Sequence, residues 1–489
     1  MRIVFALFLM VSSATAQLRV VTLPGKSPLV TFRFVLTAGA AVDPVEKPGL
    51  AYLTAMLLAN GGTREMTYRQ VADAMFPMAA SIGAQVDQEM CTFSGATHVD
   101  NLNEYYKLWR AMLLDPGWRE DDFRRVKEDA INELKVGLRG NNDEELAKEV
   151  LYQNIYRDTP YGHYSVGTVT GLEKITLDDV KQFYRIQYSQ ANLILGIAGG
   201  YSEAFLEAMK KDFRKLPEGA GFRPRPKLPA LIESTRVLIV EKDTRSVAYS
   251  IGFPIMVTRN HQDYAALLLA TSYLGQHRMS TGLLYNEMRE KRGLNYGDYA
   301  YIEYFPRGMF LMEPQPNLAR KNQIFQLWVR PVEPPTAKFA LRLAMYELDK
   351  LIREGVPAEG FARTRDFLMK YVNVLTRTKR AELGYAIDSI YYTMPRYNEH
   401  LKAAMATVTR DDVNRVVRRY LRPNRLVIVA VTKNGEELKQ QLASDEPSPM
   451  TYNSPKPDAI TDEDKIVEKW PLHLRPDDIK VVPAKEVFQ

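Results

Sequence analysis

Cysteine and histidine are both scarce in this chain of 489 residues, and their scarcity limits the chemistry that it can carry out. The single cysteine, Cys91, excludes a disulfide within the chain and any multi-cysteine zinc or iron–sulfur site. We expect it to be a small buried hydrophobic residue. No two of the six histidines stand three or four residues apart, as a metal site on one helix face would need. A Gly-x-Ser-x-Gly motif is also absent, so serine hydrolase chemistry has no motif to support it.

Strong charge of one sign and long apolar runs are missing as well. The net charge is +6, and the basic residues are scattered rather than grouped, which argues against a nucleic-acid-binding protein. No apolar run approaches the ~18 residues of a membrane span, so no transmembrane anchor is expected. What remains is ordinary globular composition, with 46% hydrophobic and 25% charged residues.

The first sixteen residues have the pattern of a cleaved secretory signal. Arg2 supplies a short positive region, residues 3–11 are apolar, and small residues at Ala14 and Ala16 precede Gln17. We therefore expect a secreted protein, or a periplasmic one in a Gram-negative host.

Strand and helix patterns follow one another in an α+β order. Residues 31–37 alternate apolar and polar side chains, which predicts a strand with one buried face, and residues 49–59 predict a helix that stops at Asn60-Gly61-Gly62. The second half of the chain repeats this order, with a predicted strand at 247–253 and a predicted helix at 264–274.

The repeat is also visible residue by residue. Residues 175–180 resemble residues 408–413, and each stretch contains a Thr-x-x-Asp capping box before a helix. Asn192 and Asn424 follow these helices, and a β-type run comes after each asparagine. We therefore predict an α+β fold of two homologous α/β-sandwich halves, each with an antiparallel-rich sheet flanked by helices.

Shifts in composition predict the domain boundaries. The expected parts are a signal peptide (1–16), a first half (17–214), a Pro- and Gly-rich linker (215–229), a second half (230–443) and a tail (444–489). The tail is predicted to be extended on the surface, with parts that dock through five residues: Trp470, Leu472, Leu474, Val481 and Val482.

Three segments carry a resemblance to a known family. Residues 48–63, residues 160–168 with their Pro-Tyr-Gly and Gly-Thr motifs, and residues 284–296 are similar to corresponding segments of the insulinase/pitrilysin-type zinc metallopeptidases, the inverzincins. The resemblance covers almost the whole mature chain. It implies that the two halves form a clam-shell.

The zinc motif of that family is degenerate in this chain. The family carries His-x-x-Glu-His on one helix, where the two histidines bind zinc and the glutamate takes a proton from the zinc-bound water. Matched to this sequence, the three positions are Tyr52, Ala55 and Met56. The family's third ligand matches Glu133, which is retained, but a lone glutamate cannot hold a catalytic zinc. We expect no metal and no cofactor in this chain, and Glu133 to be a satisfied polar group or an ion-pair partner.

The motif of the second half is intact. Arg292 and Tyr296 match an Arg/Tyr pair that, in the non-catalytic subunits of two-chain members such as the processing-peptidase alpha subunit, acts on the substrate in the partner's zinc site. Both side chains donate hydrogen bonds, as stabilising an oxyanion requires. Gly293 breaks the preceding helix, so we expect an exposed turn where truncation costs little stability. The alternative is a solvated, charged helix end. Residues 312–320, which match that subunit's glycine-rich loop, are not glycine-rich, so specificity for presequences is not expected.

Three functions remain open from the sequence. The favoured one is a pseudo-peptidase subunit that pairs, as a heterodimer, with a catalytic sister carrying His-x-x-Glu-His and zinc, and that acts on a peptide or an unfolded protein. The alternative is a binding or assembly scaffold with no role in proteolysis. The last is a self-sufficient enzyme with an unrecognised site.

Overall fold

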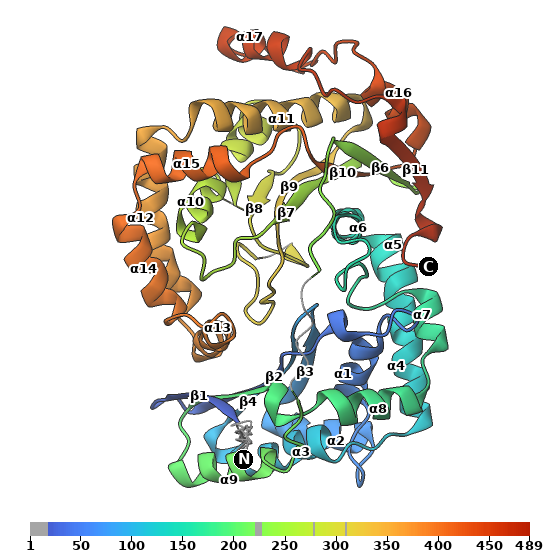
Figure 1. Cartoon of the computed structure of the whole chain (residues 1–489), viewed down its shortest axis with the longest axis vertical. Helices are drawn as coiled ribbons and strands as arrows, with labels where there is room; N and C mark the ends of the chain where they lie inside the picture. Colours follow the sequence, from blue (N-terminus) through green and yellow to red (C-terminus); the bar gives the residue numbers. More distant parts are fainter. Residues whose placement is uncertain (1–17, 221–226, 277–278, 309–310) are drawn as a thin grey trace, which may run out of the picture.

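The computed structural model describes residues 18–220, 227–276, 279–308 and 311–489, which form two α+β halves arranged as a clam-shell (Figure 1). The predicted signal peptide and part of the predicted linker lie outside the described residues. Among the residues that are described, no helix combines the length and the apolar character that crossing a membrane requires.

The first half contains five strands and nine α-helices within its described residues. In chain order these are β1 (Arg19–Pro24), β2 (Leu29–Leu36), α1 (Leu50–Asn60), α2 (Tyr68–Met75), β3 (Ser81–Val86), β4 (Cys91–His98), α3 (Leu102–Leu114), α4 (Glu120–Asn132), α5 (Arg139–Asn141), α6 (Asp143–Ile155), α7 (Val169–Lys174), α8 (Leu177–Gln187), β5 (Leu193–Gly199) and α9 (Glu203–Phe213). A π-helical turn, Glu133–Leu138, follows α4.

The second half and the tail follow in the same manner. Their elements are β6 (Arg236–Glu241), β7 (Val247–Ile255), α10 (Tyr264–Gly275), β8 (Tyr299–Tyr301), β9 (Gln323–Val332), α11 (Ala337–Glu354), α12 (Ala358–Leu375), α13 (Lys379–Tyr391), α14 (Tyr397–Thr407), α15 (Arg410–Tyr420), β10 (Val427–Thr432), α16 (Gly435–Ala443), α17 (Asp458–Val467) and β11 (Ile479–Pro483). A π-helical turn, Tyr285–Glu290, follows α10.

The two sheets share one plan. The first has the order β1-β5-β2-β4-β3 and the second the order β11-β6-β10-β7-β9-β8. In each, one long central strand pairs antiparallel on both sides: β2 with β4 and β5, and β7 with β9 and β10. Antiparallel pairs predominate in both sheets, as the sequence predicted.

The repeat predicted from the sequence is a structural one. Thr176 and Asp179 form a complete capping box at the start of α8, and Thr409 and Asp412 form the same box at the start of α15. Each helix is followed by a buried strand, β5 or β10, at the equivalent place in its sheet.

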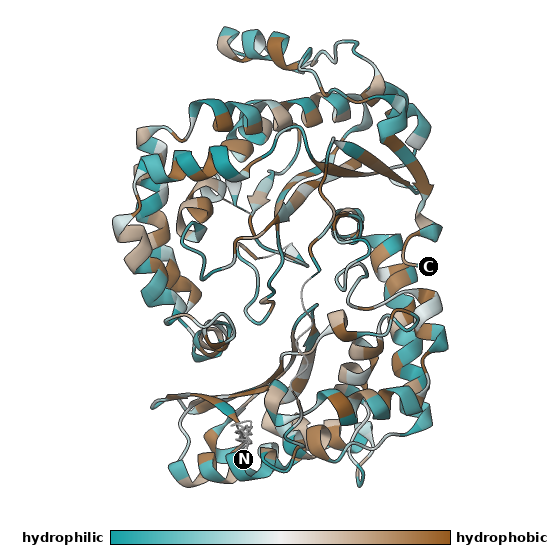
Figure 2. Cartoon of the chain, viewed as in Figure 1, coloured by the Kyte–Doolittle hydropathy of each residue, from teal (hydrophilic) through white to brown (hydrophobic). Residues whose placement is uncertain are grey.

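The prediction that residues 31–37 have only one buried face is wrong, because every residue from Val30 to Leu36 is buried. The cause is an exchange of helices between the halves. Helix α13 of the second half packs on β1, β2 and β5, while α6 of the first half packs on β7 and β10. Both helices lie between the two sheets in Figure 1, and the strands that they cover are largely hydrophobic in Figure 2.

A glycine marks the close approach of α13. A Cβ at Gly196 in β5 would stand 2.8 Å from Cδ1 of Ile387, so this position has no room for a larger residue without movement. Val35 and Ile194 from the first sheet share an apolar cluster with Leu383 and Ile387 of α13. The central strands of each sheet, β2 and β5 in the first and β7 and β10 in the second, are therefore buried on both faces.

The tail docks on the second half, but it is not simply extended. It forms helix α17, which packs on α11, and strand β11, which pairs parallel with β6 as the outer strand of the second sheet. Leu474 is buried, and the Trp470 ring lies 5.1 Å from that of Tyr346. Tail residues are thus part of the fold of the second half.

Candidate functional site

Helix α1 carries the three motif positions, and its N-terminus is well capped. The Asp43 carboxylate accepts hydrogen bonds from the backbone N–H groups of Gly49 (2.7 Å) and Ala51 (2.8 Å). Nε2 of His163 lies 3.2 Å from the same carboxylate. His163 therefore supports the start of the helix.

The motif positions face the junction between the two halves. Ala55 is fully buried, while Tyr52 and Met56 are half-buried and line a cavity of about 120 Å³. Tyr304 and Arg307 from the second half line the same cavity. The position that matches the family's zinc site is thus lined by aromatic, thioether and guanidinium groups.

The charges around this cavity do not suit a zinc ion. Burial raises the pKa of Tyr52. Arg307 lowers this pKa and Glu133 raises it, so the charges of both residues act on the Tyr52 hydroxyl. Partial desolvation acts to lower the pKa of Arg307, but Tyr164 and Tyr304 hold it above its usual value. A permanent cation therefore faces the cavity, and the retained Glu133 is solvent-exposed at the end of α4. With no imidazole present, these residues do not fit zinc.

Buried polar contacts hold the two halves together beside this cavity. Arg320 forms an ion pair with Asp87, and both side chains are at most 3% exposed. The Glu89 carboxylate accepts hydrogen bonds from the hydroxyls of Tyr161 and Tyr391 and from the Lys321 backbone N–H (2.8 Å). Because breaking such buried pairs leaves charges uncompensated, these contacts favour one fixed arrangement of the halves.

The segment that matches the glycine-rich loop takes part in this junction. The Asn317 carbonyl accepts a hydrogen bond from Gln85 of β3 (3.2 Å), and its backbone N–H donates to Asp388 of α13 (3.1 Å). The segment is therefore fixed by both halves. The sequence showed only that it lacks glycine, while its contacts come from residues more than 70 positions away.

The prediction that Arg292 is exposed is wrong. Arg292 is 4% exposed, and its guanidinium forms ion pairs with the carboxylates of Glu287 (3.0 Å), Glu463 (2.8 Å) and Asp464 (2.8 Å). The last two carboxylates belong to α17, which follows Arg292 by about 170 residues. The local pattern of polar residues and Gly293 could not reveal that the tail covers this arginine.

Tyr296 has different surroundings. It is 77% exposed, and the Arg289 guanidinium lies 5.6 Å from the centre of its ring. Arg292 is bonded to the tail while Tyr296 faces solvent, so the structure does not present them as one paired unit. Gly293, with φ of +68°, makes the turn between them, as predicted.

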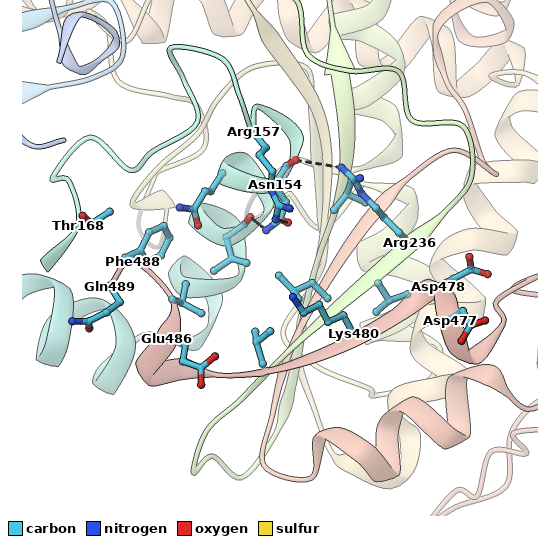
Figure 3. Close-up of a pocket in the computed structure, with 17 residues that line it drawn as sticks. Asn154, Arg157, Thr168, Arg236, Asp477, Asp478, Lys480, Glu486, Phe488 and Gln489 are labelled. Carbon is cyan, nitrogen blue, oxygen red and sulfur yellow. Dashed lines mark hydrogen bonds between the residues drawn. The ribbon is translucent and has the colours of Figure 1, made fainter. Parts of the chain in front are cut away.

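A larger cavity lies away from the motif positions. It measures about 600 Å³ and lies between α6, β6 and the C-terminal segment (Figure 3). The Arg236 guanidinium donates to the Asn154 carbonyl (3.3 Å) in this cavity, with Arg157 beside them. None of the motif residues lines it.

Two family models match the chain. The model described as insulinase (peptidase family M16) matches residues 19–169, and the model described as peptidase M16 inactive domain matches residues 174–368. The non-peptidase homolog YmxG of Helicobacter pylori is 21% identical over 418 residues, which cover 84% of this chain and 90% of that protein.

Solved structures share the fold. A structure of a peptidase M16 inactive domain from Pseudomonas fluorescens is 20% identical with a TM-score of 0.73, over 85% of this chain and 95% of that one. A protease from Helicobacter pylori is 16% identical with a TM-score of 0.74, over 84% of this chain and 96% of that one. At these identities the likeness establishes the clam-shell fold.

Proposed function

Because this chain belongs to the insulinase (peptidase M16) family and lacks the zinc-binding residues of its motif, we propose that it is the non-catalytic subunit of a zinc metallopeptidase complex outside the cytoplasm. The complex is a heterodimer in which a sister chain with an intact His-x-x-Glu-His motif holds the zinc. This chain contributes to binding of a peptide or an unfolded protein.

One observation carries this proposal: the zinc helix is kept as a helix while its chemistry is replaced. Tyr52 and Met56 still face the junction of the halves, but Arg307 places a cation on the same cavity. A chain that keeps the family fold without the zinc-binding residues is suited to a non-catalytic role, in which it binds substrate or partner. The printed name of the Helicobacter pylori relative, a non-peptidase homolog, agrees with this.

We propose different tasks for the two residues of the second-half motif. Tyr296 is exposed and its hydroxyl can donate a hydrogen bond to a substrate carbonyl in the partner's site. Arg292 would have to leave three carboxylates to do the same, so we assign it a positioning role, in which it holds the turn that carries Tyr296.

The test is reconstitution with the partner. The full mature chain, used as bait in its native host, is expected to retain a second M16 chain that carries His-x-x-Glu-His. Peptide cleavage by the purified partner should then increase when this chain is added. A partner that is equally active alone, with the complex formed, would overturn the proposal.

That outcome would support the second candidate, a scaffold of the same fold without a role in proteolysis. The buried ion pair between Asp87 and Arg320 favours this candidate, because it holds the halves in one arrangement rather than allowing them to open and close. Binding of the partner with unchanged turnover distinguishes the scaffold from the pseudo-peptidase subunit.

The location outside the cytoplasm rests on the N-terminal sequence pattern. We expect the protein in the cell envelope or the medium to begin at or near Gln17. Mass spectrometry of its N-terminal peptides checks this, and peptides that retain residues 1–16 in those fractions would contradict it.

A further inference from the structure

A buried carboxylate without a partner lies where the tail meets the second half. Glu347 of α11 is fully buried, and neither oxygen of its carboxylate has a hydrogen-bond partner among the described residues. A buried carboxylate in this condition is costly, since it has lost its water and gained no donor. Among the described residues, none supplies the donor that would satisfy it.

Two further carboxylates converge on the same point. Glu287 comes from the π-helical turn before Arg292, and Glu463 comes from α17 of the tail. One oxygen from each of Glu287, Glu347 and Glu463 can be chosen so that all three lie within 4.8 Å of one another. Three separate segments therefore aim acidic oxygens at one small space.

We propose that Glu287, Glu347 and Glu463 bind a hard divalent cation, Ca²⁺ in the first place, which fastens the tail helix α17 to α11 and to the turn that carries Arg292. An all-oxygen ligand set suits Ca²⁺ or Mg²⁺ rather than the transition metals that prefer nitrogen or sulfur. Ca²⁺ accepts six to eight oxygen ligands in a flexible geometry, whereas Mg²⁺ demands near-ideal octahedral coordination, so three carboxylates that arrive from separate segments suit Ca²⁺ better.

The neighbouring cations leave room for this ion. The buried Arg292 guanidinium pairs with only the Oε2 atom of the Glu287 and Glu463 carboxylates, which leaves the Oε1 atom of each carboxylate for an ion once the neighbouring lysines move away. Lys291 and Lys350, which bond to Glu287 and Glu463, have side chains 42% and 34% exposed and can turn to solvent. The four carboxylates, counting Asp464, outnumber these three cations, and Glu347 is the one that has no direct partner within the described part of the chain.

The experiment uses the full mature chain, freed of metal with a chelator. Titration with Ca²⁺ alone, followed by calorimetry, should give one site per chain, and Ca²⁺ should raise the thermal midpoint. Hydrogen exchange of residues 458–467 should slow on binding, because the ion holds α17 in place. Mg²⁺ should bind more weakly.

The matched variants are Glu347→Gln and Glu354→Gln. Both lie on α11 and remove one negative charge, but the Glu354 side chain is 58% exposed and outside the cluster. Glu347→Gln should weaken Ca²⁺ binding by at least about tenfold and abolish the protection of α17, while Glu354→Gln should bind as the wild type does. If Glu347→Gln does not fold, Glu463→Gln takes its place, with the same expected loss.

Two results would overturn the site. One is the absence of heat, of thermal shift and of altered exchange when Ca²⁺, Mg²⁺ or Mn²⁺ is added to the wild type at millimolar concentrations. The other is unchanged affinity in both cluster variants. If stability without metal instead rises on acidification and no cation has an effect, a bound proton rather than a cation satisfies Glu347. The site is independent of any peptidase partner, so its failure leaves the proposed function untouched.

Discussion

The two family motifs of this chain differ in what is kept, since one keeps its position without its residues and the other keeps its residues. On α1 the chemistry is replaced, yet the helix keeps its place at the junction of the halves, and Arg307 comes from the other half to face it. In the second half the residues are retained, yet Arg292 is buried under the tail. Motif residues that are retained in the sequence are therefore not always exposed in the structure. The segments that pack over a motif matter as much as its residue types.

The largest effect is expected at the retained motif. Replacing Arg292 by alanine leaves Glu287, Glu463 and Asp464 without their shared cation, which should cost about 3–5 kcal/mol of unfolding free energy. Chemical denaturation measures this. Arg289→Ala, whose side chain is 40% exposed, serves as control and should cost far less. A loss for Arg292→Ala as small as that of the control would show that the tail does not bury it in solution.

The replaced motif can be restored, and Arg307 should decide the result. We expect no stoichiometric zinc in the wild type. The triple change Tyr52→His, Ala55→Glu, Met56→His should gain zinc, with Glu133 as third ligand, and adding Arg307→Ala should tighten binding by at least about tenfold by removing a nearby cation. Metal analysis after dialysis measures the affinity.

Lys47→Ala added to the triple variant is the matched control, because Lys47 bonds to Asp179 and does not line the cavity. Equal zinc affinity with and without Arg307 would mean that the guanidinium does not act on this site.

Tyr296→Phe separates chemistry from folding at the retained motif. The change removes one exposed hydroxyl, so the unfolding free energy should stay within about 0.5 kcal/mol of the wild type. With the partner of the proposed complex saturated, turnover should fall at least about tenfold, since the proposed oxyanion donor is lost. Unchanged turnover at saturation would remove Tyr296 from the site and favour the scaffold.

A smaller effect is expected from pH at the junction of the halves. Burial, with Glu145 adding to it, raises the pKa of Glu149 from 4.5 to about 8. The folded protein then holds a proton that the unfolded chain releases above 4.5, so this group makes stability fall as pH rises between 4.5 and about 8. Glu149→Gln should make the decrease of unfolding free energy with pH less steep, by at most about 1.4 kcal/mol per pH unit.

Denaturation at several pH values measures the slope. Glu128→Gln, on the exposed face of α4, should leave it unchanged. A slope that is identical in Glu149→Gln would mean that Glu149 titrates normally.

Local sequence patterns determined the secondary structure and the repeat. The capping boxes at Thr176 and Thr409, the stop at Gly61 and the turn at Gly293 act within a few residues, so their effect can be predicted without knowing the fold. The replacement of the zinc motif by Tyr52, Ala55 and Met56 could also be predicted, because it depends on residue type alone.

Only the tertiary structure decided what lies on top of these elements. The exchange of α6 and α13 buries both faces of the central strands of the sheets, and α17 buries Arg292. The approach of Arg307 to Tyr52 and the convergence of Glu287, Glu347 and Glu463 likewise join segments far apart in the chain. The burial and the charge of these residues depend on contacts with residues far away in the chain. The periodicity or spacing of a single segment cannot predict which distant segment will pack against it.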